Sequence, residues 1–209
     1  MLSIVGLDER ARALAARLTI DPDPRRPARD TLTRFDDNVR VLNAAYRTLA
    51  DDVHRGRFIA PAADCLLDNF HLVSEEIADI RRDLPRTYAR GLPRLASREH
   101  GGRARIYEIA VELIRHSDSR LGRSQLVEFL ASYQRVAPLT LGELWAWPSM
   151  LKLALIENLR RLSDELRLAR DARGAADAYV DKASAGPVDA WSTTPEPALI
   201  VQLLHRVRA

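Results

Sequence analysis

The chain has 209 residues, of which 46% are hydrophobic, 29% charged and 6% aromatic, and its formal net charge is +3; this composition predicts one or two globular domains rich in helix. The single cysteine, Cys65, excludes an intramolecular disulfide and a cysteine-based metal site, and it fits a reducing compartment. Every basic cluster has acidic neighbours, which disfavours a nucleic-acid surface, and no window approaches a signal-peptide core or the ~20 apolar residues of a membrane span. We therefore expect the isolated chain to be soluble and cytoplasmic.

The first predicted elements are a short helix and a linker. Residues 1–20 form an N-terminal unit in which the Ala-rich stretch 3–18 predicts a helix. Residues 21–30, DPDPRRPARD, hold three prolines and predict a proline-rich linker.

Residues 31–173 are predicted to be a helical bundle domain, opening with two long helices. Apolar residues at steps of three and four indicate one amphipathic helix over 31–54 and a second over 61–83, with Pro61 in the first turn. The short connection predicts an antiparallel hairpin. The stripes expected to face the core are Leu32, Phe35, Val39, Leu42, Tyr46, Leu49 and Val53, and then Leu66, Phe70, Val73, Ile77, Ile80 and Leu84.

Three further helices complete the bundle. One is predicted over 104–116, and the next carries Leu126, Phe129, Leu130 and Tyr133 on one face. Thr140 and Glu143 have the spacing of a capping box at the start of a long central helix, which Pro148 is expected to kink. Residues 174–209 are predicted to be a linker and a C-terminal helix. No strand pattern competes, so the fold class is all-α: a multi-helix bundle around a long proline-kinked helix.

Polar residues gather on one face of the second long helix. Asp68, His71 and Glu75 fall within a narrow arc opposite Phe70, and a histidine flanked by carboxylates is able to bind a metal or pass protons. A metal needs three or four convergent ligands, and this face offers one nitrogen. We interpret it as a solvated or interhelical face, and we predict no cofactor and no metal.

Two asparagines lie near apolar stripes. Asn69 is at the margin of its stripe, where we expect a hydrogen bond to a neighbouring segment, because an unpaired polar group costs about 1–3 kcal/mol there. Asn158 is predicted on the buried side of the long helix, between Leu151 and Leu155, as a structural amide.

Two other groups invite a functional reading. His116, Asp118 and Arg120 come at a helix end, where capping explains them better than a catalytic triad does. Trp145 is a candidate for stacking on a sugar ring, although we expect it and Trp147 to fill the core. The nucleotide-binding, zinc-protease, hydrolase and redox motifs GxxxxGK[ST], GxGxxG, HExxH, GxSxG and CxxC are absent from the sequence, so no catalytic residues are assigned.

The chain resembles the N-terminal region of the bacterial cyclic β-1,2-glucan synthases in three ordered segments: LLDNFHLVSEEIADIRRDLP, RIYEIAVELIRHSDSRL and ASYQRVAPLTLGELWAWPSMLKLALIENLRRL. DDNVRVLNAAYRTLADDV and VQLLHRVR extend the resemblance over nearly the whole chain. The resemblance implies a very large membrane glucosyltransferase that polymerises glucose from UDP-glucose and cyclises the product. Its transferase and phosphorylase-like regions come after the part matched here.

Two positions depart from the family pattern. Thr87, Tyr88 and Ala89 stand where the family tends to show two tyrosines, which weakens the case for an aromatic contact around Tyr88. Ala60 stands where the family has a hydroxyl cap before Pro61, and this change is expected to weaken the helix start by about 1 kcal/mol.

The resemblance leads to one main hypothesis and two alternatives. The main one is a non-catalytic helical scaffold segment, or truncated copy, of such a synthase at the cytoplasmic face of the inner membrane. Its partners would be the transferase and phosphorylase-like regions, with a β-1,2-glucan chain as a further candidate. The first alternative is a free-standing helical module that binds an acidic partner or nucleic acid. The second is a small metal or sugar site around His71.

Overall fold

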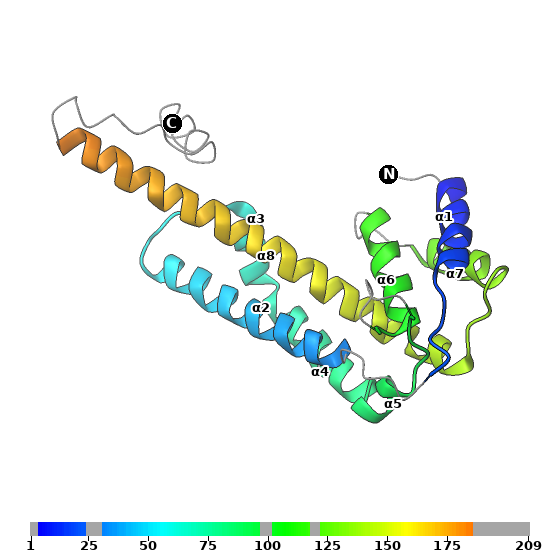
Figure 1. Cartoon of the computed structure of the whole chain (residues 1–209). Coiled ribbons are helices and arrows are strands. Elements are labelled where there is room, and N and C mark those ends of the chain that lie inside the picture. The colour runs from blue at the N-terminus through cyan, green and yellow to red at the C-terminus, as the bar shows by residue number, and fades with distance from the viewer. Residues whose placement is uncertain (1–3, 24–30, 97–101, 118–121, 186–209) are drawn as a thin grey trace. The chain divides into compact units, whose positions relative to one another are not determined.

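The computed structural model describes residues 4–23, 31–96, 102–117 and 122–185, and within these ranges the chain is all-α, as predicted (Figure 1). Extended pairing in the described ranges is limited to the isolated bridges Ile20–Leu95 and Arg94–Ala104. Most of the predicted linker over 21–30 and of the predicted C-terminal segment lies outside the described residues. The helices are α1 (Ile4–Arg17), α2 (Thr31–His54), α3 (Pro61–Asp68), α4 (Phe70–Asp83), α5 (Arg86–Arg90), α6 (Arg105–His116), α7 (Arg123–Gln134) and α8 (Leu141–Ala185).

The chain divides into two compact units, and α2 and α8 each contribute to both. The first unit comprises residues 1–43 and 69–160, and the second comprises residues 44–68 and 161–209.

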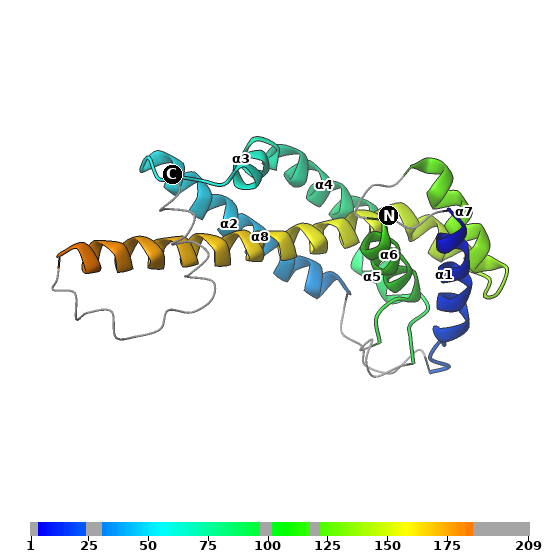
Figure 2. The ribbon, with the colours of Figure 1, turned by 90° about the horizontal axis from the view of Figure 1, so that it is seen from above.

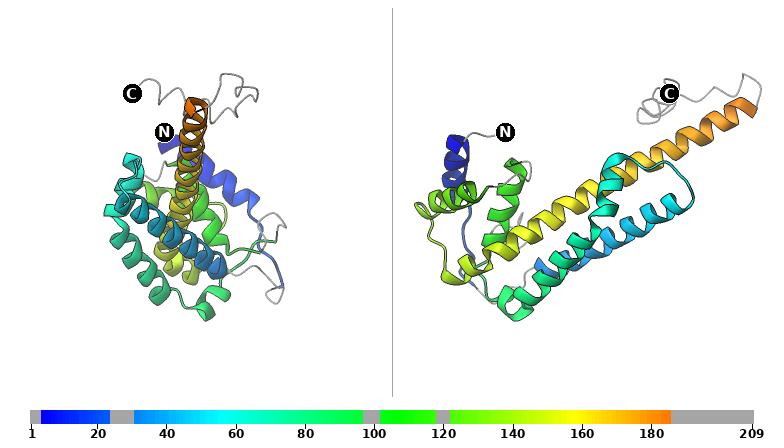
Figure 3. Two further views of the ribbon diagram at one scale, coloured as in Figure 1. Left: turned by 90° about the vertical axis from the view of Figure 1, so that its left-hand side faces the viewer. Right: turned by 180° about the vertical axis from the view of Figure 1, so that it is seen from behind.

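Helix α6 forms the centre of the first unit. It is buried on most sides, since eight of its twelve residues are buried. Helix α1 lies alongside α7 (Figures 1 and 2). Helix α4 runs beside the first part of α8 (Figure 3), where the Lys152 ammonium pairs with Glu76 at 2.5 Å and with Asp79 at 3.3 Å. The largest fully buried side chains of this unit include Tyr107, Tyr133, Phe35, Phe129, Leu42, Ile80, Leu84, Leu95, Ile106, Ile109, Leu113 and Met150.

Helix α2 begins and ends where the apolar spacing predicts, and a glycine explains its end. The N–H of Gly56 donates to the Val53 carbonyl at 3.0 Å, and the N–H of Arg57 donates to the Asp52 carbonyl at 2.9 Å. These two bonds define a Schellman motif, which requires the positive φ of 64° found at Gly56. The predicted stripe is buried except at Tyr46, which is half-buried, and Val53, which is 48% exposed. The prediction that Val53 faces the core was therefore wrong, although its neighbour Asp52 in the same turn is buried.

The second long helix is interrupted, which corrects the expectation of one helix over 61–83. Helix α3 ends at Asp68, and α4 begins at Phe70 with Asn69 between them at φ −103° and ψ 9°. The apolar stripe continues across the break, since Leu66, Phe70 and Ile77 are all buried. Spacing therefore identified the buried residues but not the break in the helix at Asn69.

Helix α8 passes through Pro148 and continues to Ala185, beyond the expected start of a linker at residue 174. Its first half is buried at Met150, Leu153, Ala154 and Ile156. Leu155 is 39% exposed and Leu151 is half-buried, so the side of α8 between them is less buried than the sequence predicts.

Candidate functional site

Glu143 is buried at the start of α8, where it forms the predicted capping box. Its carboxylate accepts from the Thr140 backbone N–H at 2.9 Å, and its own N–H donates to the Thr140 hydroxyl at 3.2 Å. The same carboxylate receives two hydrogen bonds from the Arg105 guanidinium, Nε to Oε1 at 2.8 Å and Nη2 to Oε2 at 2.6 Å. Both side chains are almost fully buried. Glu143 therefore joins α6 to the first turn of α8.

The ion pair keeps Arg105 charged. Burial disfavours the charged guanidinium, but the hydrogen bonds and charge of Glu143 outweigh burial and raise the pKa of Arg105. A third hydrogen bond runs from Arg105 Nη2 to the Pro138 carbonyl at 3.0 Å. All of these bonds hold the turn before α8, and none leaves the carboxylate open to a substrate.

Tyr88 holds the same end of α8. Its hydroxyl donates to the Gly142 carbonyl at 2.5 Å, and the ring is half-buried. A Cβ at Gly142 would contact the Tyr88 hydroxyl oxygen and a Leu92 methyl at 3.9 Å, so α5 and its following loop pack closely on α8. The Tyr88 hydroxyl thus binds protein backbone and helps to hold α5 against the first turn of α8.

The polar face of α3 and α4 is exposed to solvent. Asp68, Asn69, His71 and Glu75 are all exposed, and the Asn69 side chain makes no capping hydrogen bond to α4. Glu143, buried against α6, is not part of this face. Among the residues that the structure describes, no group of three or more histidine, cysteine, aspartate or glutamate side chains is placed to hold a metal ion.

His116 contacts Glu112 instead of a nucleophile. The imidazole Nε2 lies 3.2 Å from Glu112 Oε1, one turn earlier on α6. Asp118 and Arg120, which we grouped with it, lie outside the described residues. The Ser117 hydroxyl donates to the Ile114 carbonyl at 3.4 Å, as expected of a polar residue at a helix end.

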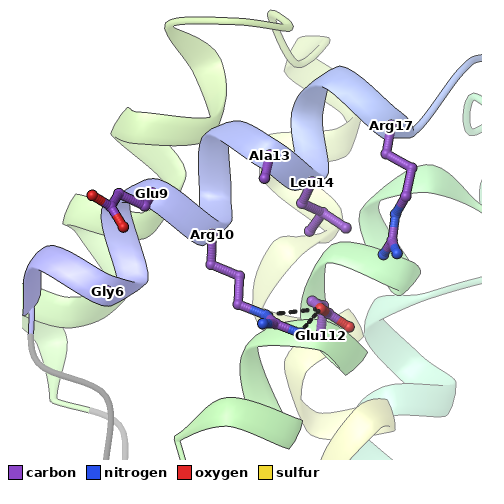
Figure 4. Close-up of a pocket in the computed structure, with 7 residues that line it drawn as sticks. All are labelled: Gly6, Glu9, Arg10, Ala13, Leu14, Arg17 and Glu112. Atoms are coloured by element: carbon purple, nitrogen blue, oxygen red, sulfur yellow. Dashed lines mark hydrogen bonds and ion pairs between the residues drawn. The ribbon is translucent and has the colours of Figure 1, made fainter.

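A cavity of about 480 Å³ lies between α1 and α6, on the side of Glu112 that faces α1 (Figure 4). Glu112 Oε1 accepts from Arg10 Nε at 3.1 Å and Nη2 at 3.0 Å. Arg17 extends from α1 toward the same region, two turns after Arg10. The lining residues are Gly6, Glu9, Arg10, Ala13, Leu14, Arg17 and Glu112. Sequence reasoning missed this cavity because its residues come from two helices far apart in the chain.

The two remaining candidate residues, Trp145 and Asn158, both lie on α8. Trp145 is 75% exposed and Trp147 is 8% exposed, so the expectation that both tryptophans fill the core was wrong for Trp145. Trp145 and Leu141, which is 69% exposed, lie one turn apart on α8. Asn158 is half-buried; because its neighbour Leu155 is exposed, it lies closer to solvent than the sequence suggested.

Two clusters of paired polar groups were not predicted. In the first unit Glu157 accepts hydrogen bonds from the Tyr107 hydroxyl and from Arg34 Nε, the latter at 2.9 Å. Burial opposes the charge on Glu157, but these two donors outweigh it and lower the pKa of the carboxyl. In the second unit Asp52 is buried and pairs with Arg57 and Arg170. Arg57 is near Asp52 in the sequence, but Arg170 and the three members of the Glu157 cluster come from segments far apart in the chain, so spacing gives no signal of their meeting.

The described residues form an all-α protein whose buried polar groups connect helices, and no described helix is long and apolar enough to cross a bilayer. No protein-family model matches the sequence. The chain is 34% identical over 186 residues to the cyclic beta-(1,2)-glucan synthase NdvB of Rhizobium meliloti (strain 1021), and the alignment covers 84% of this chain but 6% of that protein. The chain is therefore a relative of one short segment of a cyclic β-(1,2)-glucan synthase, which confirms the resemblance found in the sequence.

Proposed function

We propose that this chain is a non-catalytic helical scaffold segment of the kind found in the N-terminal region of a cyclic β-1,2-glucan synthase. The observation that supports the proposal most is the arrangement around Glu143. The most buried carboxylate among the predicted site residues is fully engaged by Arg105 and Thr140, so it fixes two helices to each other. A catalytic carboxylate needs an open face toward a substrate, and this one has none.

The proposal extends to partners and location. The scaffold would pack against the transferase and phosphorylase-like regions of a synthase at the cytoplasmic face of the inner membrane, and it would support synthesis of a periplasmic cyclic glucan from UDP-glucose. The exposed Trp145 and Leu141 on α8 are apolar side chains suited to such packing. The similarity to a synthase of which this chain spans 6% supports an assembly role.

A glucosyltransfer assay tests the scaffold proposal. The purified chain is incubated with radiolabelled UDP-glucose, with membranes that contain an active cyclic glucan synthase as the positive control. We expect no incorporation of label into polymer by the chain alone. Sustained turnover by the chain, abolished by a substitution in it, would overturn the proposal.

The alternative of an arginine-rich module for an acidic partner is less well supported. Several arginines already have carboxylate partners on their own helix, as in the pairs Arg12–Asp8, Arg40–Asp37 and Arg82–Asp79. A titration with duplex DNA at several salt concentrations distinguishes the two, because neutralisation of phosphates produces a steep dependence on salt. We expect weak binding with little salt dependence; tight binding with a steep slope would favour the alternative.

A further inference from the structure

The cavity between α1 and α6 presents donor and acceptor groups that the protein itself does not use fully. Arg10, Leu14 and Arg17 follow one face of α1 at helical spacing, and Figure 4 shows all three directed toward α6. Arg10 is engaged with Glu112 through Oε1. Arg17 is exposed and forms no ion pair among the described residues, so its five N–H donors face the cavity and solvent.

Glu112 has one oxygen left for a ligand. Its contacts with Arg10 and His116 both use Oε1, and Oε2 takes part in neither. The carboxylate side chain is 14% exposed, and it is held in place from two sides. The cavity therefore offers a positioned acceptor from α6 and an arginine donor from α1.

The balance of charge decides which class of ligand suits this cavity. Arg10 and Arg17 line it together with Glu9 and Glu112, so the formal charges cancel. A dedicated anion site would show an excess of arginine, because each carboxylate repels a phosphate. A neutral polyol fits better, since each hydroxyl both donates and accepts a hydrogen bond. The apolar Leu14 and Ala13 offer contact for the C–H face of a sugar ring.

We propose that the α1–α6 cavity is a carbohydrate-binding site in which Arg17 and Glu112 bind neighbouring hydroxyls of a neutral oligosaccharide. The volume of about 480 Å³ is within the roughly 300–1,000 Å³ of small-molecule pockets, but this one is largely open to solvent, so a bound sugar would stay partly exposed. That the oligosaccharide is a β-1,2-linked glucan rests on the proposed function. The site would then hold a segment of glucan beside the synthase.

Isothermal titration calorimetry of the full chain with short β-1,2-linked oligoglucosides tests this inference. We expect weak, saturable binding to the unsubstituted protein. Arg17→Ala removes an exposed side chain without a described ion pair, so it should leave the fold intact and weaken binding about tenfold or more. Glu112→Gln should weaken binding similarly, with helicity checked by circular dichroism. Arg47→Ala, which removes an exposed arginine of α2 that does not line the cavity, is the matched control and should bind as the unsubstituted chain does.

Other outcomes would overturn the inference. Absence of heat with the oligoglucosides, or binding by both Arg17→Ala and Glu112→Gln that is as tight as binding by the unsubstituted protein, would show that the cavity is not a carbohydrate site. Binding of inorganic phosphate that depends on Arg17 would assign the cavity to an anion. Equal affinity for β-1,4-linked oligoglucosides would overturn the linkage. None of these results bears on the scaffold proposal, which the glucosyltransfer assay tests independently.

Discussion

Arg105 and Glu143 face each other as a buried, doubly hydrogen-bonded ion pair, with Nε–Oε1 at 2.8 Å and Nη2–Oε2 at 2.6 Å. The same carboxylate caps the first turn of α8 through Thr140. One side chain therefore satisfies a buried cation and an orphan backbone N–H together. Moving a charge from water into the protein interior is costly, so each buried charge of this pair needs the other as its counterion.

We predict that Glu143→Gln destabilises the first unit strongly. Gln retains an amide oxygen for Arg105 but has no charge, so the buried guanidinium is left without a counterion. The expected loss in the free energy of unfolding is about 3–5 kcal/mol, typical of breaking a buried ion pair. Urea unfolding followed by circular dichroism measures it.

The control for this experiment is Arg40→Ala. Arg40 pairs with Asp37 on the surface of α2, with side chains 77% and 55% exposed, so its loss should cost less than about 1 kcal/mol. If both substitutions reduced stability equally, the ion pair between α6 and α8 would not have the structural role given to it here.

Two buried tyrosines are predicted to respond oppositely to loss of the hydroxyl. Tyr107 donates to the Glu157 carboxylate, so Tyr107→Phe should reduce stability by about 1.5–3 kcal/mol. The Tyr133 hydroxyl has no hydrogen-bond partner among the described residues, so Tyr133→Phe should be neutral or stabilise by up to about 1 kcal/mol. Paired urea unfolding curves test this; the opposite order of the two variants would contradict the assigned hydrogen bonding.

Alkaline pH should destabilise the protein in part through Tyr133. Burial raises the pKa of Tyr133 to about 12, whereas an unfolded tyrosine ionises near about 10. Its contribution is complete below pH ~10 and is lost as the pH rises through the folded pKa, because the unfolded chain releases the proton first. Tyr133→Phe should therefore lose stability less steeply than the unsubstituted chain between pH ~10 and ~12. Unfolding curves at successive pH values measure this; identical slopes would disagree with the burial of the hydroxyl.

The helices were readable from the sequence because their signals are local. The bounds of α2 follow from the apolar stripe that runs from Leu32 to Val53, and the capping box of Thr140 and Glu143 follows from a spacing of three. The interruption at Asn69 was missed because the buried face is continuous on both sides of it. Apolar periodicity shows which side of a helix is buried, but it does not show that a single residue leaves the helical conformation.

The pairings between helices could not be read in this way. Glu143 was recognised as a cap, but its partner Arg105 is 38 positions away, and many other arginines were equally plausible partners. The cavity lined by Arg17 and Glu112 was missed for the same reason, since α1 and α6 come together only in the folded chain. Trp145 and Trp147 differ in burial because they lie on opposite sides of α8. The prediction that both fill the core treated the two tryptophans as one apolar group.

Two glycines of the second unit are predicted to have opposite responses to alanine. Gly56 has φ of 64°, so Gly56→Ala should destabilise by about 1 kcal/mol. Gly174 lies inside α8 with nothing within 4 Å of an added Cβ, so Gly174→Ala should stabilise by about 0.5–1 kcal/mol. Thermal unfolding of the two variants provides the comparison; stabilisation by Gly56→Ala would contradict the Schellman end of α2.

Acid should destabilise the second unit through Asp52. The carboxylate is buried and receives hydrogen bonds from Arg170 Nη2 at 3.0 Å and Arg57 Nη1 at 3.2 Å. The hydrogen bonds from Arg170 contribute most to lowering the pKa of Asp52 below its ordinary value. The carboxylate's contribution to stability is therefore present above the unfolded pKa of about 3.9 and is lost as the pH falls through the lower folded pKa.

Asp52→Asn should remove this dependence on pH. The variant should be less stable than the unsubstituted chain at pH ~6, and the difference should shrink as the pH falls below ~4, where the native carboxylate also becomes protonated. Asp51→Asn is the control, because the Asp51–Arg55 pair is exposed and should contribute less than about 1 kcal/mol. Urea unfolding between pH ~2 and ~7 makes the measurement. A constant difference between Asp52→Asn and the unsubstituted chain over this range would mean that the carboxylate is not charged and paired in the folded protein.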